Sequence, residues 1–196
     1  NVNLTRITEP ADVFEKHYID SILPLTLYIV PRGTLTLDVG SGAGFPGIPM
    51  KMFRPDLRMT LVDSAKKRTD YLKAALREIG LDCAVITGRS ERLAYEPDLR
   101  EAFGFVTARA VASLPVLCEY CLPFVKVGGV FIAMKGANDE ADLARDTARV
   151  LGAQIVEVKK YALSSGDRRS LVIMEKTART PRAYPRKRMG SSERHG

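Results

Sequence analysis

Short apolar segments alternate with amphipathic segments along most of this chain. Five segments of nearly continuous apolar character predict strands buried on both faces: Thr34–Val39, Arg58–Asp63, Cys83–Thr87, Phe105–Ala108 and Val130–Met134. Between or after these strands, helical spacing of apolar positions predicts helices over Pro46–Phe53, Ala65–Ile79, Leu114–Leu122 and Asn138–Leu151. Such alternation is typical of βαβ units, so the pattern predicts a doubly wound, mostly parallel sheet with helices on both faces.

Both ends of the chain depart from this alternation. Val13–Val30 has helical character and is predicted to cap the sheet. Gln154–Tyr161 and Ser170–Lys176 alternate more strongly and are separated by a short loop, which predicts an antiparallel pair of strands. Five parallel strands followed by such a pair resemble the seven-stranded, Rossmann-like sheet of the class I methyltransferases. We expect one domain over residues 1–176, with a helical cap at 1–33 and the core at 34–176, and then an extended or mobile basic arm at 177–196.

The composition is that of one globular unit, because 45% of the 196 residues are hydrophobic and 27% are charged. The longest segment without Asp, Glu, Lys or Arg is Val39–Met50, with 12 residues, whereas a membrane-spanning helix needs about 18 or more apolar residues. The start of the chain has charges of both signs and no apolar core, unlike a signal peptide. We therefore expect no membrane segment.

Three cysteines, Cys83, Cys118 and Cys121, are a sparse and odd set, which favours the reducing cytoplasm over a disulfide scaffold. The C-x-x-C spacing of Cys118 and Cys121 resembles half a zinc site, but the chain has no second pair and only two histidines. Both cysteines lie in a predicted apolar helix. We therefore assign them to the core and predict no metal site.

The net charge of +7 is distributed unevenly along the chain. Residues 159–196 contain 11 Lys and Arg residues against 3 Asp and Glu residues, whereas residues 1–158 are close to neutral. Excess positive charge at one end is typical of contact with a polyanion such as a nucleic acid, and it is also typical of a solvated tail.

The strongest motif is a glycine-rich loop, Asp38-Val-Gly-Ser-Gly-Ala-Gly-Phe-Pro-Gly47, which follows the first predicted strand. One reading is the dinucleotide fingerprint G-x-G-x-x-G, starting at Gly42. The other is the acidic-then-glycine pattern of enzymes that bind S-adenosylmethionine, formed by Asp38, Gly40, Gly42 and Gly44.

The position of the strand favours the second reading. Asp38 and Gly40 fall at the end of the strand, whereas Gly42 comes two residues too late for a pyrophosphate fingerprint. A carboxylate at Asp38 suits a cationic ammonium group and repels a pyrophosphate, and no length remains for the substrate domain of a dehydrogenase. Asp63 ends the second strand at the offset of a ribose-binding acid, which fits either cofactor.

Motifs spread along nearly the whole chain resemble one family. The chain is similar to the bacterial small-subunit ribosomal RNA methyltransferase G family, also called glucose-inhibited division protein B. The segments that carry the resemblance are Asn3-Leu4-Thr5, His17-x-x-Asp20-Ser21, Leu37–Pro49, Leu61–Arg68, Arg89–Leu93, Arg109–Leu114, Met134–Gly136 and Tyr184–Lys187. The Phe45-Pro46-Gly47 extension of the glycine loop makes the match specific, while residues 188–196 do not follow the family's usual ending.

The resemblance implies that S-adenosylmethionine methylates N7 of one guanine in the decoding region of 16S ribosomal RNA. It also implies cofactor contacts from Gly40, Phe45, the pair Ser90-Glu91 and Arg109, although the family more often has Ala in place of Ser90. Together with the loop and Asp63, the predicted cofactor-binding residues are Asp38, Gly40, Gly42, Gly44, Phe45, Asp63, Ser90, Glu91 and Arg109.

The residues after the fourth predicted strand fit N7 chemistry. Thr107-Ala108-Arg109-Ala110 lacks the Asp/Asn-Pro-Pro-aromatic motif of exocyclic-amine methyltransferases. Guanine N7 carries a lone pair and no proton, so its methylation needs alignment of the reacting atoms rather than a general base. No catalytic acid or base is therefore assigned, and Phe45, Arg109 and Lys135 are the positioning candidates.

The RNA-binding candidates are basic residues near the predicted sheet edge and in the arm: Lys135, Arg168, Arg169, Arg186 and Lys187. His17 and Asp20, three residues apart on the predicted cap helix, are interpreted as a structural hydrogen-bonded pair. The expected partner is 16S ribosomal RNA or the small ribosomal subunit, bound by a monomer. Two alternatives stay open: an NAD(P)-dependent oxidoreductase, and a non-catalytic RNA-binding protein on a Rossmann-like scaffold.

Overall fold

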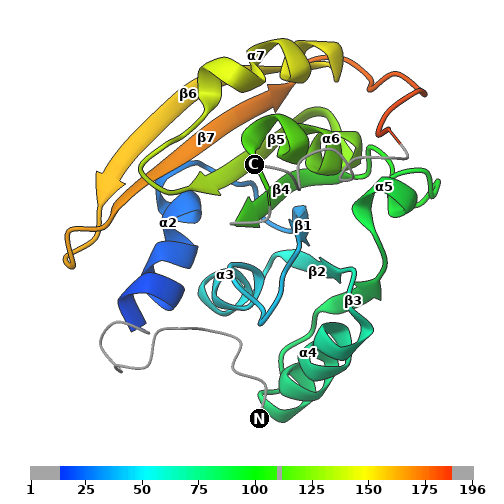
Figure 1. Cartoon of the computed structure of the whole chain (residues 1–196). Helices are drawn as coiled ribbons and strands as arrows, with labels where there is room; N and C mark the ends of the chain where they lie inside the picture. Colours follow the sequence, from blue (N-terminus) through cyan, green and yellow to red (C-terminus); the bar gives the residue numbers. More distant parts are fainter. Residues whose placement is uncertain (1–13, 110–111, 187–196) are drawn as a thin grey trace, which may run out of the picture.

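The computed structural model describes residues 14–109 and 112–186, which form a seven-stranded sheet between two layers of helices (Figure 1). The strands lie in the order β3-β2-β1-β4-β5-β7-β6. The first five are parallel, and β7 is inserted antiparallel between β5 and β6. Their bounds are β1 Leu35–Val39, β2 Arg58–Asp63, β3 Ala84–Thr87, β4 Phe103–Arg109, β5 Val125–Lys135, β6 Ala153–Ala162 and β7 Arg168–Lys176.

Helices cover both faces of this sheet (Figure 1). On one face, Leu25, Met50 and Leu72 of three different helices pack in a single apolar cluster with the sheet. On the other face, Leu117 and Ala144 belong to a second cluster. The helices are η1 Phe14–Ile19, α2 Asp20–Leu27, α3 Gly47–Phe53, α4 Lys66–Glu78, α5 Ser90–Leu93, α6 Leu114–Cys121, η2 Leu122–Phe124 and α7 Ala141–Val150. None of the helices in the described ranges is long and apolar enough to cross a membrane.

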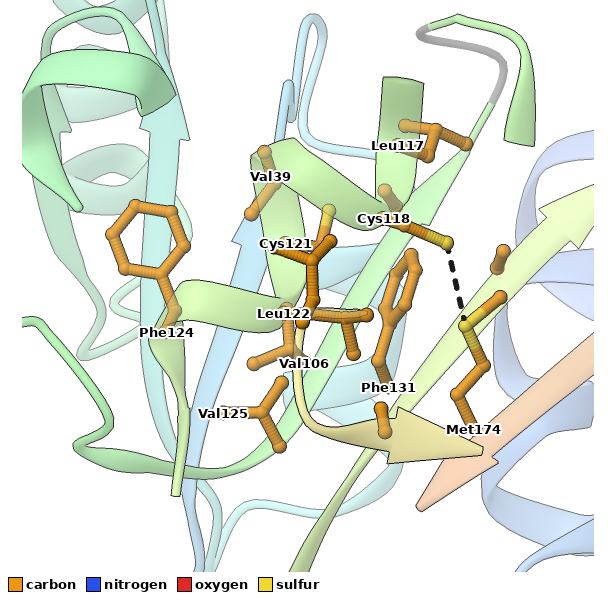
Figure 2. Packing of buried hydrophobic residues seen from close by; sticks show 14 of the residues in the cluster. Val39, Val106, Leu117, Cys118, Cys121, Leu122, Phe124, Val125, Phe131 and Met174 are labelled. Atoms are coloured by element: carbon orange, nitrogen blue, oxygen red, sulfur yellow. Dashed lines mark hydrogen bonds between the residues drawn. The ribbon is translucent and has the colours of Figure 1, made fainter. Parts of the chain in front are cut away.

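The two cysteines of α6 belong to the core, as the sequence predicts (Figure 2). Cys118 and Cys121 are fully buried, and the thiol of Cys118 lies 3.6 Å from the sulfur of Met174 on β7. Burial raises the pKa of the Cys118 thiol to about 12, so the thiol stays protonated at neutral pH. These side chains therefore pack the apolar layer beneath α6.

The predicted elements are confirmed, with differences at glycines and in short segments. Strand β4 begins at Phe103 and β5 at Val125, earlier than predicted, because Gly104 and the Gly128-Gly129 pair interrupt the apolar pattern. The β4–β5 register shifts between Phe103 and Phe105, so the strands continue through an irregularity that a pattern of side chains does not reveal. The short helices α5 and η2 were not predicted, since one turn leaves no periodic signal.

The segment 177–186, here called the C-terminal strap, is bound to the domain. The guanidinium of Arg100 donates to the carbonyl oxygens of Thr180, Pro181 and Tyr184 at 3.1–3.2 Å. Arg186, at the end of the strap, pairs with the buried carboxylate of Glu119 on α6. Of the two alternatives expected for the arm, extended or mobile, these contacts favour the extended one for residues 177–186, while residues 187–196 lie outside the described ranges.

Candidate functional site

The carboxyl end of β1 leads into the glycine-rich loop, which turns towards β2. Gly40 and Gly42 have φ values of 75° and 57°, a left-handed conformation that favours glycine. The N–H of Gly40 donates to the carbonyl of Val62 on β2 at 2.8 Å, and the N–H of Gly42 donates to Oδ2 of Asp63 at 3.0 Å. The loop backbone is therefore held against the end of the neighbouring strand.

Two later glycines of the same motif are required for packing. A Cβ atom on Gly44 would lie 2.4 Å from Ile48, and one on Gly47 would lie 2.3 Å from Leu61. A Cβ atom on Gly47, at the start of α3, would also lie 2.9 Å from Oδ2 of Asp38 on β1, so this position lets α3 approach the sheet, whereas Gly44 lies against side chains of α3 and α4. Of the glycines in the literal G-x-G-x-x-G match, Gly47 is thus explained by helix–sheet packing.

Asp38 lies beneath the loop and is fully buried. Its Oδ2 accepts a hydrogen bond from the N–H of Gly47 at 3.1 Å, whereas Oδ1 has no hydrogen-bond partner among residues 14–109 and 112–186. Burial raises the pKa of Asp38 to about 6, against the opposing effects of the Ser41 hydroxyl, the Gly47 N–H and the positive charge of Arg109. An unpaired, buried carboxylate oxygen is costly unless a cation or donor arrives to meet it.

An open cleft of about 280 Å³ runs along the carboxyl ends of β1, β2 and β4. Five predicted cofactor residues line it: Gly40, Asp63, Ser90, Glu91 and Arg109. The lining also includes Arg68 and Tyr120, which were not predicted as cofactor residues.

The carboxylate of Asp63 in this cleft is held in one orientation by three neighbouring groups. Its Oδ1 accepts from the N–H of Ala65 at 2.8 Å, Oδ2 accepts from Gly42, and the guanidinium of Arg68 lies 3.4 Å away. The side chain is 2% exposed, so the backbone of two loops and one cation hold its orientation. Arg68 opens α4, where a cation opposes the helix dipole, and its pairing with Asp63 accounts for its position.

A cluster around Arg109, at the end of β4, joins the glycine loop to the N-terminal cap. The guanidinium donates to the carbonyl of Lys16 at 3.1 Å, lies 3.3 Å from Nδ1 of His17 and stands 5.3 Å from the ring centre of Phe45. The rings of His17 and Phe45 are 4.9 Å apart. Burial, and then the charge of Arg109, lower the pKa of His17, so the ring is neutral and Nδ1 accepts. The proton is then on Nε2, which is buried and has no hydrogen-bond partner in the described part of the chain.

A second cavity, of about 380 Å³, lies on the other side of Arg109. Its lining comes from the cap, from β4 and β5, and from the β6–β7 hairpin: Lys16, His17, Asp20, Arg109, Met134, Lys135, Gly136, Tyr161 and Arg169. Arg109 lines both cavities. The first cleft and the second cavity therefore meet at one guanidinium.

The predicted residues fall into three places. Gly40, Phe45, Asp63, Ser90, Glu91 and Arg109 lie along the first cleft or at its junction with the second cavity, with Asp38, Gly42 and Gly44 in the loop behind. Lys135 and Arg169 line the second cavity. Arg168 is exposed at the start of β7, Arg186 is paired with Glu119 in the strap, and Lys187 lies outside the described residues.

The sequence pattern gave too small a role to the cap and did not single out Tyr161 on the β6–β7 hairpin, although it did name Arg169 there. The sequence analysis expected His17 and Asp20 to pair with each other. Instead, each of them faces Arg109. The hydroxyl of Tyr161 on β6 donates to Oδ1 of Asp20 at 2.6 Å. Nothing in the local pattern around Tyr161 distinguishes it from other strand positions. The His17-x-x-Asp20-Ser21 motif was the available signal that the cap contributes to the site.

This sheet order, with a glycine loop after β1 and an acidic residue ending β2, defines a class I methyltransferase fold. A solved structure described as a putative sarcosine dimethylglycine methyltransferase from Galdieria sulphuraria has a similar fold, with a TM-score of 0.64 at 12% identity, over 81% of this chain and 84% of that one.

The family is shown by sequence. Residues 1–172 match the model of the family described as rRNA small subunit methyltransferase G, and the chain belongs to that family. The ribosomal RNA small subunit methyltransferase G of Pelotomaculum thermopropionicum is 47% identical over 191 residues, which cover 95% of this chain and 80% of the relative. That of Lactobacillus delbrueckii subsp. bulgaricus is 45% identical over 192 residues, with the same coverage. The resemblance found in the sequence is thus confirmed, and the oxidoreductase alternative loses its support.

Proposed function

We propose that this protein transfers a methyl group from S-adenosylmethionine to N7 of a guanine in 16S ribosomal RNA. The observation that carries the proposal is the junction at Arg109, where a cleft suited to the cofactor meets a second cavity at the carboxyl ends of β4 and β5. Family membership supports methyl transfer to ribosomal RNA of the small subunit.

The residues of the first cleft fit S-adenosylmethionine. When bound, this cofactor supplies an electrophilic methyl group on a positively charged sulfur. Asp38 lies behind the cleft lining, and its buried Oδ1, which has no hydrogen-bond partner among the described residues, is the acceptor that we propose for the cationic ammonium of the methionine portion. Asp63 stands at the ribose-binding position, and Ser90 and Glu91 line the part of the cleft expected for the adenine. The left-handed turns at Gly40 and Gly42 keep side chains out of the approach.

Three polar groups at the junction, Arg109, His17 and Tyr161, are not available as bases, which fits a reaction that needs none. Arg109 stays protonated at physiological pH and cannot accept a proton, and Nδ1 of His17 is already occupied by that guanidinium. The hydroxyl of Tyr161 is held as a donor by Asp20, since burial and this hydrogen bond raise its pKa. Guanine N7 offers its lone pair without deprotonation, so the chain's task is to orient the base and exclude water.

The rim of the second cavity supplies cations for the RNA backbone or for guanine O6. Lys135 and Arg169 line this cavity, and Arg168 is exposed beside it on β7. A donor placed on N7 itself would occupy the lone pair that must attack, so these groups are expected to contact O6 and phosphates. We propose that the protein acts on the small ribosomal subunit or its RNA, as a monomer in the cytoplasm.

The experiment that tests this function is methyl transfer followed by mapping. Small subunits from cells that lack the modification are incubated with the protein and labelled S-adenosylmethionine, and the 16S RNA is digested and analysed by mass spectrometry. One labelled 7-methylguanosine in one fragment is the expected result. Label on another base or another atom, or no label in naked RNA, assembly intermediates and finished subunits alike, would refute the proposal.

A further inference from the structure

We propose that the second cavity receives the target base and that Asp20 selects guanine by accepting hydrogen bonds from its N1–H and 2-amino group. The inference rests on the proposed function, which supplies the base and the methylated atom. It assigns a specificity-determining residue that the cofactor chemistry does not require. The chemical class of ligand is a purine with hydrogen-bond donors on the edge opposite N7.

The cavity has the size and position of a base site. Its volume of about 380 Å³ lies within the range of small-molecule pockets. It opens at the carboxyl ends of β4 and β5 and shares Arg109 with the cofactor cleft. A base that is to react with a bound cofactor must lie next to that cleft, because methyl transfer needs the two reacting atoms in contact.

Asp20 is the carboxylate that lines this cavity, among five side chains that are cationic or nitrogen donors: Lys16, His17, Arg109, Lys135 and Arg169. Its side chain is 4% exposed. Within the described ranges, Lys135 is held by Glu140 at 3.3 Å, and both Lys16 and Arg169 have an ion pair with Asp167 at the rim. Among the described side chains that line the cavity, Asp20 is therefore the one carboxylate acceptor, and it lies among several cations and nitrogen donors.

The two oxygens of Asp20 differ in their partners. Oδ1 accepts the hydroxyl of Tyr161 at 2.6 Å. Oδ2 faces the guanidiniums of Arg109 at 3.8 Å and Arg169 at 3.6 Å, both beyond hydrogen-bond distance. Oδ2 is thus held by charge and, in the described part of the chain, receives no hydrogen bond. A carboxylate has room for several hydrogen bonds, so Asp20 is an oriented acceptor with free capacity.

A buried acceptor discriminates between purines by their Watson–Crick edges. Guanine presents two donors there, N1–H and the 2-amino group, whereas adenine presents the N1 lone pair, which a carboxylate repels. In guanine this edge lies on the opposite side of the base from N7. A guanine held by Asp20 therefore leaves N7 unencumbered, while the wall cations can meet O6.

The test compares guanosine with inosine, which lacks only the 2-amino group. Small subunits are reconstituted with 16S RNA that carries one or the other at the target position, and kcat/KM for methyl transfer is measured for the wild-type protein. The loss of one hydrogen bond to a charged acceptor predicts at least a ~10-fold lower kcat/KM for inosine. Equal rates for the two bases would overturn the assignment of Asp20, whatever its variants do.

The Asp20→Asn variant separates recognition of the base from cofactor binding. We expect kcat/KM for guanosine to fall about 100-fold and the guanosine-to-inosine ratio to shrink below about threefold, with the Kd for S-adenosylhomocysteine within about twofold of wild type. The matched control is Asp139→Asn, which neutralises a carboxylate paired with Lys160 outside the cavity and is expected to behave as wild type. A folded Asp20→Asn protein that keeps the wild-type ratio would refute the inference.

Failure of the inference and failure of the proposed function give different results. If the wild-type protein methylates N7 of guanosine and inosine equally, the function stands and the role of Asp20 is wrong. If it transfers no methyl group to N7 of guanine in any form of the subunit, the proposed function fails, and the inference fails with it.

Discussion

The proton on Asp38 is predicted to make cofactor binding depend on pH. The pKa of about 6 means that about half of the free protein carries a proton on this carboxyl at pH 6. A cationic cofactor pairs with the ionised form, so binding near pH 6 releases about half a proton per site. The ionised fraction is about nine-tenths at pH 7 and one-tenth at pH 5, and the apparent affinity for S-adenosylmethionine is therefore expected to fall about tenfold between these values.

Calorimetry measures this coupling directly. Titrations with S-adenosylmethionine at pH 5, 6 and 7, in two buffers that differ in ionisation enthalpy, give both the Kd and the number of protons released. The Asp38→Asn variant is expected to bind more weakly at pH 7 and to lose the tenfold pH dependence. His17 is the other titratable group of the site near this range, and His17→Gln is the control that should retain the dependence. An affinity that does not change from pH 5 to pH 7, with no proton release, would show that Asp38 is not the partner of the cofactor cation.

The same carboxyl is predicted to lower the free energy of unfolding of the cofactor-free protein as the pH rises. Its pKa in the folded state is raised from 3.8 to about 6, so the folded state binds the proton more tightly than the unfolded state does. Asp38 therefore opposes folding as the pH rises from about 4 to about 6, by up to about 3 kcal/mol above pH 6. In chemical denaturation, this portion of the pH profile should disappear in Asp38→Asn, and bound cofactor should offset it.

Three further substitutions have distinct expected results. Lys135→Ala should lower methyl transfer to small subunits about tenfold or more while the Kd for S-adenosylhomocysteine stays within about twofold, because Lys135 lines the second cavity and not the first cleft. An equal loss of cofactor affinity would contradict this assignment of Lys135 to RNA rather than to the cofactor. Arg186→Ala should cost about 2 kcal/mol, a value between those of exposed and buried pairs, because it removes the cation from the buried Glu119 and leaves it the backbone N–H of residue 186. Thermal unfolding should show a decrease in Tm of about 4–8 °C, which Glu119→Gln in the same chain should largely restore. Arg109→Lys should weaken cofactor binding and increase amide exchange over residues 14–27, since one ammonium cannot replace a guanidinium that contacts Lys16, His17 and Phe45 together. Unchanged amide exchange in that segment would refute the role of Arg109 in holding the N-terminal cap against the sheet.

The sheet was predictable because buried strands and amphipathic helices have strong periodic signals, and the Asp38-to-Gly47 loop was predictable because few turns need that spacing of glycines. The acidic residue at the end of β2 followed from strand position alone. The second cavity was not predictable in this way. It is assembled from the cap, β4, β5 and the β6–β7 hairpin, and contacts such as Asp20 with Tyr161, 141 positions apart, leave no trace in local patterns.

The basic end of the chain shows why net charge alone misplaces a nucleic-acid surface. Part of the charge after residue 158 is used within the protein: Lys176 is buried, where it donates to the carbonyls of Leu122 and Val125, and Arg186 neutralises Glu119. Arg169 turns into the second cavity. A composition count registers these residues as surplus cations, although their partners lie far away in the sequence. We expect the polyanion at the cavity rim, where cations and the reacting atom must meet the same nucleotide.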